Sequence, residues 1–186
     1  MTAFAYPQVQ VAIRTLIALM FLSGAVGKAR HFTAFQGVLG NYRLLPQFLL
    51  VPAAIILPPL EAATAAGLLL GWAAPWPAAS AMILLTLFAL AMGINILRGR
   101  HDIDCGCFQT ALKQHLSWML VVRNALLVFL LQVAIAPTLG SADLATTIGG
   151  LLAGSVLFVI LQSLDILWSI VPAWRAARRQ GIGVPA

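Results

Sequence analysis

Charged residues are scarce in this sequence. Only 9% of its 186 residues are Asp, Glu, Lys or Arg, and 61% are apolar. Soluble globular domains contain roughly 25% charged and 45–50% apolar residues, so this composition excludes a protein whose main solvent is water. The sequence also lacks internal repeats and low-complexity tracts, and it has little polar chain for a separate soluble domain. We therefore expect a single integral membrane domain over residues 1–186.

The N-terminus lacks the features of a cleaved signal peptide. Its opening stretch, MTAFAYPQVQ, carries no positive charge, and no small-residue cleavage site follows the first apolar run. A secretory signal needs both features. The first apolar run is therefore expected to remain in the mature protein as a helix.

Long apolar runs make up most of the chain. A run of about 20 apolar residues can cross a hydrocarbon core of roughly 30 Å as a helix. Pro75 and Pro77 open the third run, Ser117 is a plausible N-cap of the fourth, and Pro137 ends it. The predicted fold is an all-α, polytopic transmembrane bundle, with a four-helix core and a fifth, C-terminal transmembrane helix. The predicted spans are residues 9–26, 46–72, 77–97, 117–136 and 148–171.

Basic residues exceed acidic ones and give a formal net charge of +6, but they form no stripe with interleaved aromatic residues. The expected partner is therefore the lipid bilayer and not a nucleic acid. Nine of the eleven basic residues share one membrane face if the chain crosses five times. The positive-inside rule then predicts an outside N-terminus and an inside position for residues 98–116. The nine are Lys28, Arg30, Arg43, Arg98, Arg100, Lys113, Arg175, Arg178 and Arg179.

Four ionisable side chains fall inside the predicted spans. Each costs at least about 2.5–3.5 kcal/mol at mid-depth unless it is paired or hydrated. Arg14 and Asp165 lie near enough to the ends of their spans to reach the interface by snorkelling. The other two are Glu61 and Arg123.

Glu61 follows Pro58 and Pro59, which remove backbone donors, so we expect a broken helix beside this acid. Arg123, followed by Asn124, is its candidate partner. Such a pair predicts either an interior ion pair that fixes helix packing or a site for a ligand such as a quinone head group.

Glycines cluster in two of the predicted spans. Small residues let helix backbones approach closely in membranes. We therefore expect close-packing faces at Gly24 with Gly27, and at Gly149, Gly150 and Gly154.

Both cysteines lie in the one long polar stretch, residues 98–116. Side chains two residues apart in an extended strand point to opposite sides, so a bond between Cys105 and Cys107 needs a tight turn, which Gly106 permits. The small ring would be strained, and strained disulfides have the higher reduction potentials. The pair therefore favours reversible dithiol chemistry over stapling of a fold, with either cysteine as the attacking thiolate.

Two other interpretations of this stretch stay open. His101, Cys105, Cys107 and His115 supply two imidazoles and two thiolates, which are ligands for zinc or Cu(I), although one residue between the cysteines departs from the usual zinc spacing. Alternatively, the cysteines are inert and the chain is a non-enzymatic membrane scaffold. The favoured interpretation is redox chemistry without a metal.

Several motifs resemble the family of the methylamine utilisation protein MauE, within the wider group of DoxX-like small membrane proteins. The similarity covers most of the chain up to residue 135, and its most specific part is CGCF with the Arg-Asn pair that follows. The matching motifs are Gly24 with Lys28, YRLLP at 42–46, PPLE at 58–61, RGR and DCGCF within 98–108, and Arg123 with Asn124.

This resemblance implies a factor of the bacterial cytoplasmic membrane for processing, transport or maturation of the β (small) subunit of methylamine dehydrogenase. Cys105 and Cys107 would exchange electrons with a thioredoxin-like partner of the MauD type, or with the cysteines of that exported subunit. Apart from the resemblance, the charges at Glu61 and Arg123 suggest the further hypothesis that a quinone bound near them regenerates the disulfide. The residues expected to position or tune the pair are Arg98, Arg123, Asn124 and Glu61. Oxidation of a periplasmic substrate needs the pair on the outer face, against the positive-inside prediction.

Overall fold

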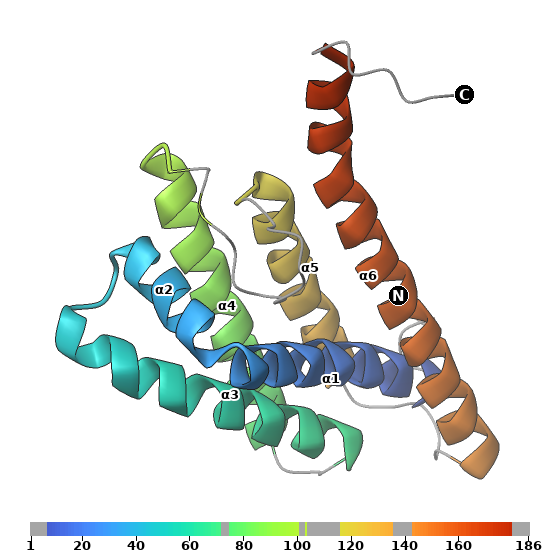
Figure 1. Cartoon of the computed structure of the whole chain (residues 1–186). Helices are drawn as coiled ribbons and strands as arrows, with labels where there is room; N and C mark the ends of the chain where they lie inside the picture. Colours follow the sequence, from blue (N-terminus) through green and yellow to red (C-terminus); the bar gives the residue numbers. More distant parts are fainter. Residues whose placement is uncertain (1–6, 72–74, 101–102, 104–115, 136–142, 180–186) are drawn as a thin grey trace.

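The computed structural model describes residues 7–71, 75–100, 103, 116–135 and 143–179, with side chains up to residue 167. All regular structure in these ranges is helical (Figure 1), which confirms the all-α prediction for them. The helices are α1 (Pro7–Arg30), α2 (Phe32–Tyr42), α3 (Gln47–Leu69), α4 (Trp76–Leu97), α5 (Trp118–Ala134) and α6 (Leu144–Arg179).

Four of these helices are long and apolar enough to cross a membrane, namely α1, α3, α4 and the Leu144–Leu167 part of α6. The chain is therefore a multi-pass membrane protein. α5 has 17 residues, so its length at 1.5 Å per residue is about 26 Å, less than a hydrocarbon core of roughly 30 Å. A fifth membrane crossing stays a prediction.

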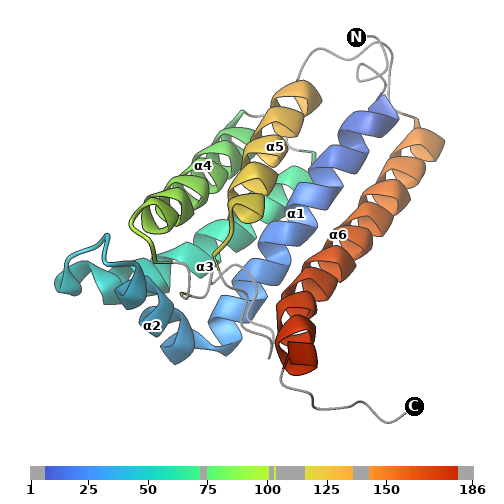
Figure 2. The ribbon, with the colours of Figure 1, turned by 90° about the horizontal axis from the view of Figure 1, so that it is seen from above.

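α2 occupies a segment that the apolar pattern treated as a connection. Its buried residues are Phe35 and Tyr42, which anchor it against the larger helices. It ends at Arg43, whose backbone is left-handed (φ 49°) and whose N–H donates to the carbonyl of Gly40 at 3.2 Å. α2 lies across one end of the bundle beside α3 (Figures 1 and 2).

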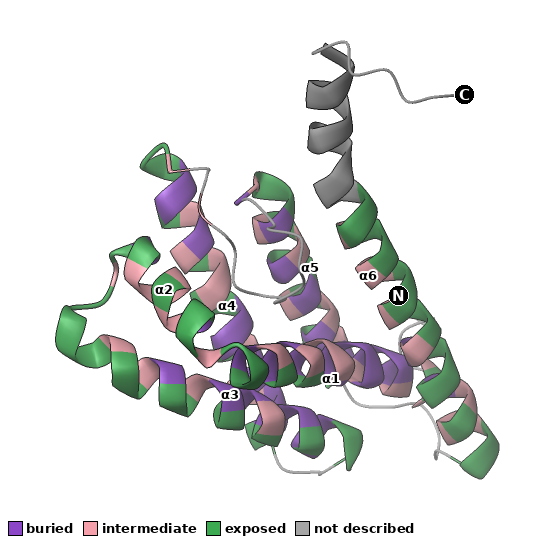
Figure 3. Cartoon of the chain, viewed as in Figure 1, coloured by how far each residue is buried: buried purple, intermediate pink, exposed green. Residues whose placement is uncertain are grey.

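α1 lies at the centre of the bundle and contacts α3, α5 and α6 (Figure 2). The main hydrophobic cluster is formed by α1, α3, α4 and α5 around the fully buried Ile17 and Leu131. α6 packs along α1 at the edge, and most of its outer side is exposed (Figure 3). In Figure 2, α1, α4 and α6 run in one direction and α3 and α5 in the other.

The contact between α1 and α6 depends on glycines. A Cβ on Gly150 would lie 2.6 Å from the Cβ of Val11, and a Cβ on Gly154 would lie 2.5 Å from the carbonyl oxygen of Ala12. Real Cβ atoms do not approach other atoms this closely, so a larger residue would force the helices apart. The predicted close-packing face at Gly149, Gly150 and Gly154 is thereby confirmed.

Gly154→Ala should loosen α6 from α1, because the new methyl group would overlap a backbone carbonyl that cannot rotate away. Overpacking of this kind costs about 1–3 kcal/mol, so the thermal unfolding midpoint of the purified protein in lipid nanodiscs should fall. Gly93→Ala on α4 is the control, since nothing lies within 4 Å of a Cβ there. Equal midpoints for the two variants would contradict this packing.

Candidate functional site

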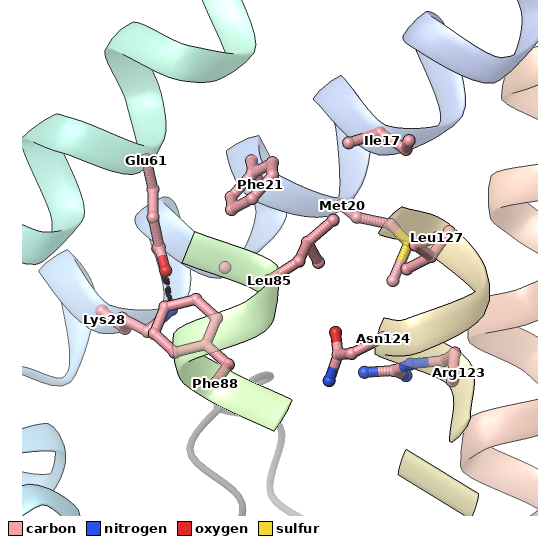
Figure 4. Close-up of a pocket in the computed structure, with 11 residues that line it drawn as sticks. Ile17, Met20, Phe21, Lys28, Glu61, Leu85, Phe88, Arg123, Asn124 and Leu127 are labelled. Atoms are coloured by element: carbon pink, nitrogen blue, oxygen red, sulfur yellow. Dashed lines mark hydrogen bonds and ion pairs between the residues drawn. The ribbon is translucent and has the colours of Figure 1, made fainter. Parts of the chain in front are cut away.

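Lys28 and Glu61 are the most buried charged residues in the described part of the chain, at 4% and 1% exposure. Lys28 lies near the C-terminal end of α1, and Glu61 lies within α3. The Lys28 Nζ donates to both carboxylate oxygens of Glu61, at 2.6 and 2.7 Å (Figure 4). Two opposite charges in an apolar interior offset each other's desolvation, and removing one of them leaves the other uncompensated. The pair therefore ties α1 to α3.

Two aromatic rings flank the ammonium group of this ion pair. The Lys28 Nζ lies 5.6 Å from the ring centroid of Phe35 on α2 and 5.3 Å from that of Phe88 on α4. A cation within about 6 Å of a ring centroid is attracted to the negative face of the ring. The ion pair thus also brings α2 and α4 to the same point.

α3 presents Glu61 from a helix that runs from Gln47 to Leu69 with Pro58 and Pro59 inside it. The predicted break in the helix is therefore wrong. Each proline removes one backbone donor, but the surroundings of a membrane helix can satisfy the carbonyls that are freed. The ion pair holds α3 beside α1 immediately after the prolines.

Arg123 on α5 pairs with Asp165 on α6, through its Nη1 and the Asp165 Oδ2. The predicted ion pair between Glu61 and Arg123 is wrong, because each of these charges has a closer counter-charge on another helix. Asp165, expected to snorkel, lies instead against Arg123 with its side chain 16% exposed. Arg14 donates from Nη2 to the carbonyl oxygen of Ala134 at 3.2 Å, at the C-terminal end of α5.

A cavity of about 40 Å³ lies between the Lys28–Glu61 ion pair and Arg123 (Figure 4). Its polar lining residues are Lys28, Glu61, Arg123 and Asn124, so three of the predicted site residues do meet at one place. Asn124 is 3% exposed and donates from Nδ2 to the carbonyl of Leu120 at 3.1 Å. A cavity needs about 10–15 Å³ to hold one water molecule. This cavity can therefore hold water, but it is too small for a quinone ring.

Cys105 and Cys107 lie outside the described residues, as do His101 and His115. The cysteine segment is residues 104–115. The residues that flank it, Ile103 and Leu116, are described. The N–H of Leu116 donates to the carbonyl of Ile103 at 3.1 Å. Ile103 and Leu116 belong to a second hydrophobic cluster, together with Tyr42, Met92, Ile96 and Leu120. The chain therefore enters and leaves the cysteine segment at one point, where α2, α4 and α5 meet.

α4 ends just before this segment. Gly99 takes a positive φ of 74°, and its N–H donates to the carbonyl of Ile96 at 2.9 Å. Arg100 is held by the fully buried Asn95, with its N–H 3.0 Å from the Asn95 carbonyl oxygen and its Nη1 3.4 Å from Oδ1. Arg98, the C-cap of α4, is exposed and lies at neither ion pair.

Sequence reasoning missed the role of Lys28, which it counted as a loop charge of the inside face. That count was wrong for Lys28, because α1 continues to Arg30 and buries it. An available signal was Glu61 itself, since an acid inside a membrane span needs a counter-charge at the depth that it occupies. The exposed Arg30 and Arg43 remain as basic residues at this end.

Glu61→Gln should lower the free energy of unfolding by about 3–5 kcal/mol, because it leaves the Lys28 ammonium buried without its counter-charge. Adding Lys28→Met to Glu61→Gln removes that charge and should restore a large part of the loss. The measurement is the thermal unfolding midpoint in nanodiscs for both single variants and the double variant. A double variant whose loss equals the sum of the single losses would contradict the coupling.

Known proteins resemble this chain over nearly its whole length. The family model described as methylamine utilisation protein MauE matches residues 6–139, a range that includes α1 to α5 and both cysteines. The methylamine utilization protein MauE of Paracoccus denitrificans is 43% identical over 173 residues, which cover 91% of this chain and 92% of that protein.

Two further relatives carry the same name in other organisms. The MauE protein of Methylorubrum extorquens is 44% identical over 165 residues, covering 86% of this chain and 88% of that protein. The MauE protein of Methylophilus methylotrophus is 32% identical over 164 residues, covering 87% and 86%. No solved structure matches the chain.

Proposed function

The chain belongs to the MauE family of methylamine utilisation proteins, and from this premise we propose that it is a factor of the bacterial cytoplasmic membrane for maturing the β (small) subunit of methylamine dehydrogenase. Processing and transport of that subunit belong to the same role. The proposed chemistry is thiol-disulfide exchange at Cys105 and Cys107, with a thioredoxin-like protein of the MauD type as partner. The hydrogen bond between Ile103 and Leu116 carries the proposal, because it joins the two described residues that flank the cysteine segment at the end of the bundle.

The exchange starts with the Cys105–Cys107 disulfide. A thiolate of the substrate or partner attacks one of its sulfurs and forms a mixed disulfide, and the other sulfur leaves as a thiolate. A second thiolate of the same substrate then attacks the substrate sulfur of the mixed disulfide and releases the reduced pair. Two electrons and two protons pass from the substrate dithiol to the cysteine pair, and the substrate gains one disulfide.

The described residue that precedes the pair supports this chemistry. Since Cys105 is two residues from Ile103, chain length alone keeps their Cα atoms within about 7 Å. Ile103 packs against the cluster of Tyr42, Met92 and Ile96, which is a rigid base for a reactive loop. The pair would therefore work where α2, α4 and α5 meet.

The other predicted site residues would act as positioning residues. Glu61 holds α3 on α1, and Arg123 ties α5 to α6. Asn124 lines the small cavity between the Lys28–Glu61 ion pair and Arg123. The exposed Arg98 at the end of α4 adds positive charge at the start of the cysteine segment, and positive charge near a cysteine favours its thiolate.

Cys105→Ser and Cys107→Ser, each alone, should abolish formation of the disulfide-bonded β subunit and growth on methylamine, with unchanged amounts of the variant in the membrane. The disulfides are measured by alkylation of free thiols and gel shift. His101→Ala and His115→Ala are controls from the same segment, because thiol exchange needs no imidazole. Unimpaired cysteine variants would instead indicate an inert scaffold, and impaired histidine variants would indicate a metal site.

The side of the membrane on which the pair works can be measured directly. Arg30, Arg43, Arg98 and Arg100 lie at the end of the bundle where the cysteine segment begins and ends, and the positive-inside rule predicts that this end is cytoplasmic. A membrane-impermeant thiol reagent should then label the reduced pair in inverted vesicles only. Labelling in intact cells would contradict this orientation and would give the pair direct access to an exported subunit.

A further inference from the structure

An apolar pocket of about 450 Å³ lies between α2, α3 and α4. This volume is within the range of about 300–1,000 Å³ that is usual for small-molecule sites. Lys28 is the one charged side chain among its described lining residues, and the others are almost all aliphatic or aromatic. The pocket is distinct from the small cavity beside Arg123. The two share only Lys28 and Phe88 among their described lining residues.

The pocket is accessible from the lipid side of the bundle. Leu87 and Leu90 line it and are 54% and 56% exposed. Both belong to α4, which is long and apolar enough to span the membrane. Exposed leucines on a membrane-spanning helix face acyl chains, so a ligand dissolved in the bilayer can enter without passing through water.

One wall of the pocket is also the base of the cysteine segment. Tyr42 and Met92 line the pocket and belong to the cluster against which Ile103 packs. Ile103 is two residues before Cys105. The pocket therefore reaches from the Lys28–Glu61 ion pair to the side chains on which the start of the cysteine segment rests.

We propose that this pocket binds an isoprenoid quinone, and that the quinone is the oxidant that restores the Cys105–Cys107 disulfide. The inference rests on the proposed exchange function and names its electron acceptor. The cavity between Glu61 and Arg123, where a quinone was expected, is too small at about 40 Å³. The larger pocket, which Lys28 also lines, is the proposed quinone site instead.

The chemistry of the lining favours a quinone over a plain acyl chain. An ammonium group has three N–H donors, and Glu61 accepts two from Lys28, which leaves one for a carbonyl oxygen of a head group. The rings of Phe35 and Phe88 lie beside that ammonium and can stack on a flat ring. The leucines toward the lipid side suit an isoprenoid tail. An acyl chain would use none of the polar features at this depth.

The reaction balances without another reactant. The two thiols of the reduced pair give two electrons and two protons to the quinone, the S–S bond forms, and both quinone oxygens become hydroxyls. The quinol then returns to the bilayer through the lipid side of the pocket. Each turnover thus makes one disulfide and one quinol.

Binding of decylubiquinone to the full-length protein in phosphatidylcholine nanodiscs tests the pocket. Ala91→Phe places a ring among the lining residues and should weaken binding at least about tenfold, the effect of overpacking. Ala63→Phe is the matched control on an exposed position of α3 and should change affinity less than about twofold. Equal affinities for the two variants, or no saturable binding to the parent protein, would overturn the inference.

A second pair of variants keeps the test decisive if Ala91→Phe fails to fold. Leu90→Trp changes the lipid side of the pocket, and Ile83→Trp lies on the same helix outside the pocket with 59% exposure. Only Leu90→Trp should weaken binding. Weaker quinone binding by Ile83→Trp than by Leu90→Trp would overturn the pocket assignment.

Mixing the reduced protein with decylubiquinone in a single turnover tests the electron transfer. One quinone should be consumed for each two thiols lost, and Cys105→Ser protein should bind quinone normally but consume none. Cysteines that exchange with a dithiol substrate but are not oxidised by quinone would overturn this inference and leave the proposed function intact. Cysteines that exchange with neither would overturn both, whether or not quinone binds.

Discussion

A lysine and a glutamate buried against each other inside a membrane bundle constrain all of the helices around them. Lys28 and Glu61 are 33 positions apart and lie on different helices, yet neither is tolerable at this depth alone, because hydrocarbon cannot solvate a charge. Their contact therefore requires α1 and α3 to cross at one place. Phe35 and Phe88 enclose the ammonium group, so the same requirement positions α2 and α4.

This ion pair also links the features that bear on function. On one side is the small cavity that also reaches Arg123 and Asn124. On the other side is the larger apolar pocket, whose wall includes Tyr42 and Met92. Those two side chains support Ile103, where the chain enters the cysteine segment. A redox-active loop on this base would have a lipid-accessible pocket beside it and a rigid bundle beneath it.

The second ion pair has a different structural role. α6 makes most of its contacts with α1 and packs along it through glycines. The pairing of Arg123 with Asp165 adds a link from α5 to this outer helix. Close backbone packing, the side chains of Phe158 and Leu161 against the core, and this ion pair together hold a helix whose outer side faces lipid. Between membrane helices the hydrophobic effect provides no such force.

The helices and the membrane environment could be predicted from the sequence because both depend on local features. Windows of apolar residues at 9–26, 46–72, 77–97 and 148–171 each predicted a helix that the structure contains, and the motif CGCF marked the family. α2 was missed because its 11 residues lack a span-length apolar run. The break expected in α3 was wrong because neighbouring helices stabilise a helix that its prolines weaken.

The choice of partners for the buried charges was decided by tertiary structure alone. Glu61 and Arg123 are opposite charges inside two predicted spans, which made them candidate partners. Coulomb energy, however, depends on distance in space. Helix packing places Lys28 beside Glu61 and Asp165 beside Arg123. The sequence by itself determined that these charges needed partners inside a membrane bundle. Only the crossing of the helices determined which partners they found, and it also made the apolar pocket beside Lys28, which no run of residues encodes.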